Sequence, residues 1–303
     1  MFPIIPASSA ASFPKNDEGI FGFGDDGSPS TYTAVTNLVS NTGVVASDTA
    51  GVGSIRGEGP AACEYGEDKG IFGFGYNCSP GPACDNIGIT SLVSNTGVVG
   101  SDVAAVGSAR RNVAACSFGE DEGIFGFGYS EGTGYTGITN LVSNTGVVAS
   151  DTAGVGTGRR FLSATEYGGD KGIFSVGSLG SCTNLVSNTG VVASDVAGVG
   201  TERTGTAACG YGGDKGIIYG SKTGTQYSNL ISNAGVVAAD TAGVGTARRI
   251  LAGCEYGGDK GIFGYGGSPN VSMTNLVSNA GVVASDVAGV GTARSQLAAC
   301  SFN

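Results

Sequence analysis

The chain has 303 residues, a formal net charge of −10 and 57 glycines, but no histidine and no tryptophan. Without an imidazole it can form no Ser-His-Asp or Cys-His dyad and no histidine metal site, so we expect neither catalysis nor a metal or other cofactor. The acidic balance argues against nucleic acid as a partner. No stretch of 18 apolar residues occurs, so we expect no membrane insertion. The start, interrupted by Pro3 and Pro6, does not read as a signal peptide.

One phrase repeats six times along the chain. Its opening glycine, which precedes Ile-Phe in most copies, recurs at intervals of 44 to 53 residues: Gly19, Gly70, Gly123, Gly172, Gly216 and Gly261. Repeats of this length are typical of solenoids, propellers and arrays. The repeat, rather than the chain length, therefore decides the expected architecture.

Each unit resolves into four short strands that are rich in Val, Ile, Thr and aromatic residues. In the last complete copy these are 251–256, 261–266, 273–278 and 281–285, separated by Gly- and Asn-containing turns. Such turns supply the positive φ that hairpins need. No 3.6-residue apolar period is sustained, so helices should be nearly absent. Four antiparallel strands in 40–50 residues predict one blade of a β-propeller.

The two ends of the chain predict a closed ring. Residues 296–302 resemble the first strand of a unit, whereas the N-terminal unit begins at the second strand, 19–24. We expect the C-terminal strand to complete the first blade, since an open ring would leave two unpaired edges. The fold class is therefore all-β, a six-bladed propeller in a single domain, 1–303, preceded by an N-terminal arm at 1–13. The expected blades are 19–50 with 295–303, then 57–106, 111–155, 160–199, 204–244 and 249–290.

The cysteines fall into two groups. Five occupy one column of the repeat, with Thr165 in the sixth copy: Cys63, Cys116, Cys209, Cys254 and Cys300. Equivalent positions around a ring are too far apart to bridge, so we expect small buried side chains there. Cys78 and Cys84 lie in an insertion of one unit and are a candidate disulfide; free thiols are the alternative.

Aspartate and arginine form a second recurring pattern. Each recurring aspartate precedes an arginine by eight residues: Asp48 and Arg56, Asp102 and Arg110, Asp151 and Arg159, Asp195 and Arg203, Asp240 and Arg248, Asp286 and Arg294. Six copies could form a ligand ring, but active sites are seldom sixfold. We expect a structural ring in which each carboxylate caps turn amides or pairs with an arginine beside a blade junction.

The order Gly-Ile-Phe-Gly-Tyr-Gly-Gly, a variable loop, Asn-Leu-Val-Ser-Asn-Ala-Gly-Val-Val and Gly-Thr-Ala-Arg resembles the kelch repeat. The resemblance covers about residues 19–302 and implies propeller blades. The chain departs from the family in carrying valine near the expected tryptophan, for example at Val283, and Gly-x-Gly in place of many di-glycines. The phrase Asn-Leu-Val-Ser-Asn-Thr-Gly-Val-Val-Ala-Ser-Asp also resembles propeller repeats of tailed bacteriophages. That second resemblance implies a virion or host-contact protein.

The loops that fail to repeat should gather on one face. They are 25–34, 76–88, 129–138, 178–181, 220–227 and 267–272, together with the residues after each arginine. Binding residues concentrate on loops of rigid scaffolds, and Tyr and Arg are enriched at binding hot spots. The candidate binding residues are Tyr32, Tyr76, Tyr129, Tyr135, Tyr227, Arg111, Arg160, Arg249 and Lys222. Drift in unconstrained loops is the alternative.

These patterns predict a non-catalytic structural or binding module, located on a virion or an extracellular surface. The expected partners are other virion or surface proteins, or a cell-surface glycan; the sequence does not indicate an oligomeric state. One alternative is a glycan-binding, lectin-like propeller. Another is a propeller glycoside hydrolase or lyase that uses the carboxylates Glu64, Glu166 and Glu255. Their shared column gives these three residues no distinct acid and base roles.

Overall fold

A computed structural model describes residues 16–27, 32–78 and 84–303 of the chain. Within these ranges it contains strands, turns and isolated bridges and no helix, which confirms the predicted all-β class. Accordingly, no described segment is a helix able to cross a membrane. The expected arm at 1–13 and parts of the variable loops 25–34 and 76–88 lie outside the described residues.

Six antiparallel sheets account for most of the strands. The middle strand of each carries the Gly-Ile-Phe phrase or its variant: β1 (Glu18–Gly22), β4 (Lys69–Gly73), β10 (Glu122–Gly126), β15 (Lys171–Ser175), β18 (Lys215–Lys222) and β22 (Lys260–Gly264). On one side it pairs with β24 (Ala298–Phe302), β3 (Ala61–Tyr65), β9 (Ala114–Phe118), β14 (Ser163–Tyr167), β17 (Ala207–Tyr211) or β21 (Ala252–Tyr256). On the other side it pairs with β2 (Thr36–Val39), β7 (Thr90–Val93), β13 (Thr139–Val142), β16 (Thr183–Val186), β19 (Thr225–Ile231) or β23 (Thr274–Val277).

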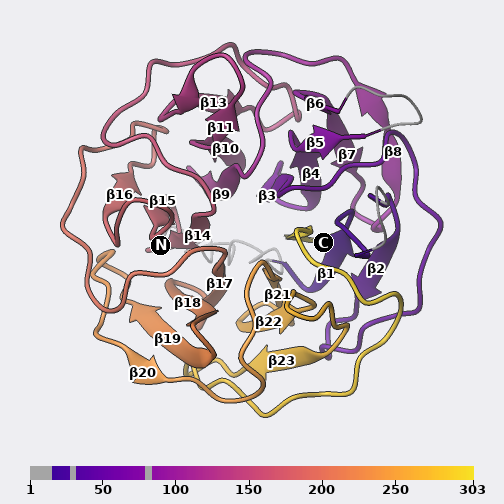
Figure 1. The fold of residues 1–303 in the computed structure, drawn as a ribbon, viewed down its shortest axis with the longest axis vertical. Coiled ribbons are helices and arrows are strands. Elements are labelled where there is room, and N and C mark those ends of the chain that lie inside the picture. The colour runs from indigo at the N-terminus through magenta and orange to yellow at the C-terminus, as the bar shows by residue number, and fades with distance from the viewer. Residues whose placement is uncertain (1–15, 28–31, 79–83) are drawn as a thin grey trace, which may run out of the picture.

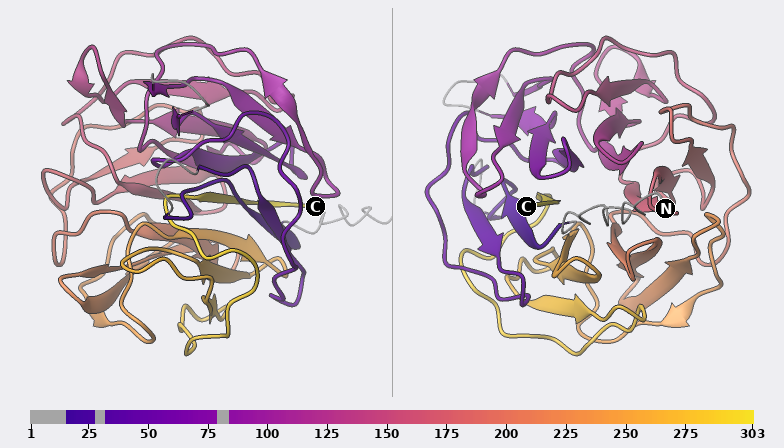
Figure 2. Two further views of the ribbon diagram at one scale, coloured as in Figure 1. Left: turned by 45° about the vertical axis from the view of Figure 1, so that its right-hand side comes forward. Right: turned by 180° about the vertical axis from the view of Figure 1, so that it is seen from behind.

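The six sheets are arranged around a common centre (Figure 1). The strands nearest the centre neighbour one another in the order β24, β3, β9, β14, β17 and β21, and β21 in turn neighbours β24. Seen from behind, the C-terminus lies near the centre of the same arrangement (Figure 2). Each sheet therefore has a sheet on both sides, and the first is next to the last.

The first sheet is built from both ends of the chain. The C-terminal strand β24 pairs with β1 in antiparallel register, with Gly19 opposite Ser301 and Ile20 opposite Cys300. The predicted pairing of these two segments is confirmed. β1 is therefore paired along both of its edges, by β24 on one side and by β2 on the other.

The core lies between neighbouring sheets. Successive side chains of a strand point to opposite faces, so Ile20 and Phe21 of β1 contact different neighbours. Ile20 packs in one cluster with Phe72, whereas Phe21 packs in another with Ile262, and all four side chains are fully buried. Each unit thus completes the core of two others, which is why no unit could be stable alone.

The predicted fourth strand is wrong for most units. A regular one forms in the second unit, β8 (Val99–Val103), and a two-residue one in the fifth, β20 (Thr241–Ala242). Elsewhere only isolated bridges form, such as Val39 with Val45. The cause lies in the neighbouring strand: Asn37 Nδ2 donates to Ala46 O at 3.0 Å, and thereby takes a carbonyl that a backbone ladder would use. In the second unit this position is Ser91, and there the five-residue strand forms.

Candidate binding face

A recurring arginine is buried at each junction between sheets. Arg110 is fully buried and stacks on the Phe74 ring of its own unit, with the guanidinium carbon 4.3 Å from the ring centroid. Its Nε donates to Phe127 O at 2.9 Å and its Nη2 to Asn140 Oδ1 at 2.6 Å, both in the next unit. One side chain therefore joins two units through stacking and hydrogen bonds. The same stacking recurs for Arg56 on Phe23, Arg159 on Phe127 and Arg294 on Tyr265.

The recurring aspartate lies across the same junction. Asp151 accepts hydrogen bonds from Asn140 Nδ2 at 2.9 Å and from Ser108 Oγ at 2.6 Å. Burial raises the pKa of Asp151, but these hydrogen bonds and the charge of Arg110 outweigh it and hold the pKa below its usual value. The carboxylate thus both caps a turn and faces an arginine. That arginine belongs to the preceding unit and is not the one eight residues later in sequence. The ion pairs are Arg56 with Asp102, Arg110 with Asp151, Arg159 with Asp195, Arg203 with Asp240 and Arg248 with Asp286, at 3.0 to 3.9 Å.

The cysteine column explains the recurring glycine. Cys63 is buried against Gly123 of the next unit, where an added Cβ would lie 2.6 Å from the Cys63 sulfur. The same contact joins Cys116 to Gly172, Thr165 to Gly216, Cys209 to Gly261, Cys254 to Gly19 and Cys300 to Gly70. All five cysteines are free thiols, and burial raises their pKa. They are small packing residues, as the sequence indicated.

Three glutamates lie on the inner strands of the six sheets and line a common cavity. Glu64, Glu166 and Glu255 alternate around it with Ser117, Gly210 and Ser301 in the same column of the repeat. Glu64 Oε2 accepts from Ser117 Oγ at 2.5 Å, and Glu64 Oε1 accepts from Ser301 N at 2.7 Å. The cavity that the glutamates line has room for only a few water molecules. Glu64 therefore connects two other inner strands.

The constant turns hold neighbouring sheets together by a ring of backbone hydrogen bonds. Gly66 N donates to Asp121 O of the next unit at 2.7 Å. Equivalent bonds run from Gly119 to Asp170, Gly168 to Asp214, Gly212 to Asp259, Gly257 to Asp17 and Asn303 to Asp68. One such hydrogen bond joins each pair of neighbouring sheets, so the residues of the constant turns have a structural role.

The non-repeating loops bring aromatic rings and arginines together. Two short ribbons carry three of the tyrosines: β5 (Tyr76–Asn77) with β6 (Asp85–Asn86), and β11 (Tyr129–Ser130) with β12 (Gly134–Tyr135). The Tyr32 and Tyr76 rings meet edge to face at 6.3 Å. Arg111 lies between Tyr76 and Tyr129, 4.5 and 4.9 Å from their centroids. We call this continuous set of contacts the Tyr–Arg array; it runs from Tyr32 through Tyr76, Arg111 and Tyr129 to Arg160 at the start of the fourth unit.

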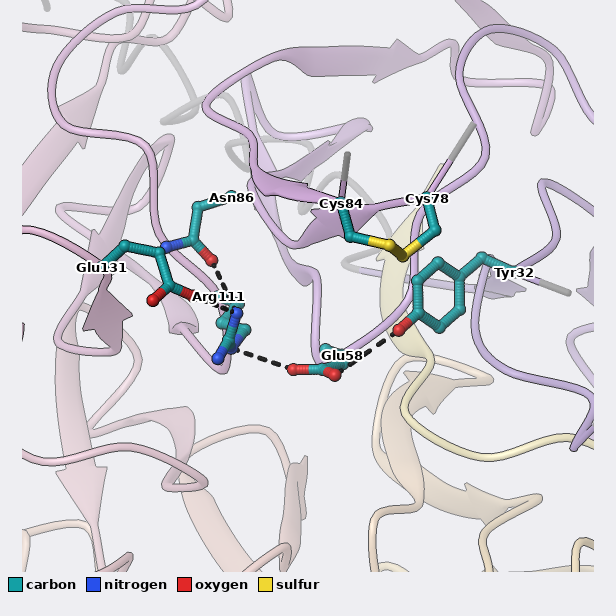
Figure 3. The surroundings of a disulfide bond; sticks show 7 residues. All are labelled: Tyr32, Glu58, Cys78, Cys84, Asn86, Arg111 and Glu131. Atoms are coloured by element: carbon teal, nitrogen blue, oxygen red, sulfur yellow. Dashed lines mark hydrogen bonds and ion pairs between the residues drawn. A yellow bond between two sulfur atoms is a disulfide. The ribbon is translucent and has the colours of Figure 1, made fainter. Parts of the chain in front are cut away.

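Within the array the charge of Arg111 is neutralised by two carboxylates. Its guanidinium forms ion pairs with Glu58 at 2.9 Å and Glu131 at 2.7 Å (Figure 3). The carboxylate of Glu58 also accepts from the Tyr32 hydroxyl at 3.4 Å. Burial, together with the charge of Glu58, raises the pKa of Tyr32 to about 12. The positive charge of Arg111 is therefore balanced by carboxylates within the array.

Cys78 and Cys84 form a disulfide beside the array (Figure 3). The bond joins the segments that follow β5 and precede β6, so it closes the end of that ribbon. Because Tyr76 lies on β5 and Asn86 on β6, the disulfide limits the freedom of both residues next to Arg111.

The array ends in a cluster around Arg160. Its guanidinium carbon lies 4.9 Å from the Phe161 ring, 5.3 Å from Tyr129 and 5.5 Å from Tyr135. The Tyr129 and Tyr135 rings contact each other edge to face at 5.8 Å. Tyr135 is 41% exposed, whereas the other rings are partly buried.

Of the remaining candidate residues, Tyr227 and Arg249 make no contact with the array within the described part of the chain, and the side chain of Lys222 lies outside that part. The ring of Tyr227 faces the buried Arg203 at 5.5 Å. Arg249 is exposed, and its backbone bridges Gly267. The backbone of Lys222 ends β18 opposite Thr225. The predicted face is therefore uneven, with its aromatic residues concentrated over one half.

Glu58, Glu131 and Phe161 lie in segments predicted to vary, but they were not among the predicted binding residues. Glu58 and Phe161 both follow a recurring arginine by two positions and take a left-handed backbone, with φ of 46° and 57°. The fifth unit has Gly205 at this position, with φ of 69°. Gly205 is the feature of the sequence that could have indicated this conformation, because a glycine at one copy of a repeated position indicates a positive φ there. At such a site the backbone turns and presents a variable side chain beside the array.

No family model fits the sequence, and no curated protein is significantly similar to it.

Proposed function

We propose that the chain is a six-bladed, kelch-like β-propeller that acts as a non-catalytic binding module. Three features support this architecture: the cyclic order of the inner strands, the pairing of β24 with β1, and cores buried between every pair of neighbouring sheets. A frame of this kind presents its loops with little movement between free and bound states. The module would therefore be preorganised for its ligand.

The Tyr–Arg array is the observation that carries the binding role. The residues shared by all six units are used in contacts between sheets. The array instead uses positions that differ among the units: tyrosine follows Gly-Phe-Gly at Tyr76 and Tyr129 only, and a second arginine follows the recurring one at Arg111, Arg160 and Arg249 only. Tyrosine and arginine provide large, rigid contact surfaces with polar ends, and they dominate binding hot spots. Loops that only connect strands give no reason for tyrosines and arginines to cluster on one half of the face, so their clustering favours a binding role.

The setting we propose is a virion, in which the module contacts other virion proteins or the host surface. The resemblance of the repeats to phage propellers supports this setting. The test is incorporation of the tagged chain into particles, compared with Tyr76→Ser and Tyr129→Ser variants. Incorporation that depends on these tyrosines supports a protein partner on this face. A purified chain that associates with no particle, host surface or glycan would refute the proposal.

A lectin-like role is the second candidate, and the exposure of Tyr135 favours it. Tyr135 is 41% exposed and its ring contacts Tyr129 edge to face, so the residue offers an apolar ring surface that is already oriented. A glycan array separates the two candidates. Glycan binding that is lost in Tyr135→Ser and retained in Tyr227→Ser supports the lectin. Particle incorporation without glycan binding supports the protein partner.

A further inference from the structure

Two arginines of the array differ in how their charge is satisfied. Arg111 has carboxylates at 2.9 and 2.7 Å. Arg160 has no ion pair within the described residues. Its Nε, like the Nε of Arg111, is buried without a hydrogen-bond partner, so the two arginines differ in their ion pairs. Its terminal nitrogens make no hydrogen bond within the same part of the chain and are not buried. In a chain of net charge −10, one guanidinium of the array thus lacks an anion.

The position of Arg160 is fixed by its surroundings. Its backbone N donates to Ser178 Oγ at 3.1 Å, and its carbonyl accepts from Ser178 N at 2.9 Å. Rings of Tyr129, Tyr135 and Phe161 surround the guanidinium within 5.5 Å. These rings remove water from part of the cation, which strengthens its attraction to an anion. The side chain is therefore preorganised, and little entropy is lost when it binds.

We propose that Arg160, Tyr129 and Tyr135 form a binding site for an acidic sugar residue of a polysaccharide. The guanidinium would pair with the carboxylate, since its planar donors match the two carboxylate oxygens. The exposed Tyr135 ring would pack against the apolar face of the sugar. This inference rests on the proposed binding function of the face and names the chemistry of its ligand. Arg111, already neutralised by Glu58 and Glu131, would support the ribbon without taking an anion.

The test measures binding of the full-length chain to polygalacturonate, with dextran as the neutral polymer and poly-glutamate as a peptide carrying the same carboxylate. We expect polygalacturonate to bind and both others to bind at least about tenfold more weakly. Arg160→Ala should weaken polygalacturonate binding at least about tenfold. Arg160→Lys should restore only part of it, because the ammonium keeps the charge without the planar fork. Thermal unfolding of each variant checks that it is folded.

Arg249→Ala is the matched control, because it removes one exposed positive charge elsewhere in the same chain. Binding within about twofold of the unsubstituted chain is expected for it. Equal losses in Arg160→Ala and Arg249→Ala would overturn the proposal, since they indicate attraction by net charge alone. Binding of poly-glutamate as tight as that of polygalacturonate would also overturn it. If a neutral glycan or a protein binds through Tyr32 and Tyr76 without Arg160, this inference fails while the binding function stands.

Discussion

Arg294 donates from Nη2 to Asn37 Oδ1 at 2.8 Å, across 257 residues of sequence. Its Nε donates to Phe23 O at 2.8 Å, and its guanidinium stacks on Tyr265 at 4.2 Å. These are the contacts that Arg110 makes between the second and third units. The junction between the last and first sheets thus uses the same chemistry as the junctions within the chain.

Removal of residues 296–303 should prevent this closure. The deletion takes away β24, exposes the edge of β1 and leaves the neighbouring cores open, so we expect an aggregating or unfolded product. Size-exclusion chromatography and circular dichroism of the truncated and full-length chains test this. A monomeric truncated chain with an unchanged unfolding midpoint would contradict the closure.

Gly123→Ala should destabilise the fold by about 1–3 kcal/mol, because its Cβ would overlap the Cys63 sulfur and approach Glu64 O. The control is Gly132→Ala, where nothing lies within 4 Å and the change should be within about 0.5 kcal/mol. Denaturant unfolding measures both. The double variant Cys63→Ala, Gly123→Ala should recover part of the loss, and an additive loss would show that the contact is not the cause.

The sequence predicted the recurring strands and packing residues more fully than the contacts that the recurring side chains make between units. The strand order, the C-terminal pairing and the packing role of the cysteines follow from periodicity and turn residues, which are local. That Arg110 pairs with Asp151 of the next unit, and not within its own, depends on how the sheets pack. The effect of Asn37 on the outer strand is local to one hairpin, but the residue pattern does not reveal that a side-chain amide takes the place of a backbone donor there.

Only part of the candidate binding face could be predicted, again because contacts between units are not local. Tyrosines and arginines in variable loops indicated the Tyr–Arg array. Tyr227 and Arg249 are residues of the same types in variable segments, but they do not belong to the array. Glu58 and Glu131 form ion pairs with Arg111, whereas Arg160 has no such partner among the described residues. These two glutamates come from different units. Their approach to Arg111 depends on loop conformation, which no local pattern specifies.

Acid should unfold the protein over a narrow pH range. The six recurring aspartates, among them Asp151, have folded-state pKa values below the usual 3.8. A lowered folded-state pKa gives stability that is present above the unfolded-state pKa and is lost as pH falls through the folded value. The free energy of unfolding should therefore fall steeply below about pH 4. Asp151→Asn should reduce that slope, and an unchanged slope would contradict the assignment.

Thiol labelling should divide the cysteines by burial. In the native protein Cys182, which is partly exposed, should react, whereas the five buried thiols should not. Their raised pKa also keeps them protonated, and protonated thiols are poor nucleophiles. Ellman's reagent should detect six thiols after denaturation and eight after reduction, since Cys78 and Cys84 are paired. Six reactive thiols in the native protein would contradict the buried column.

The central claim is that residues shared by all six units hold the sheets together, while residues that differ among the units form the proposed binding face. The neighbours Arg159 and Arg160 test it most directly, because Arg159 is fully buried and donates to Asn184 Oδ1 at 2.6 Å, whereas Arg160 belongs to the array. The measurement is the free energy of unfolding of Arg159→Met and Arg160→Met in denaturant. We predict a loss of about 3–5 kcal/mol for the first and of less than about 0.5 kcal/mol for the second. Equal losses for the two variants would contradict the account.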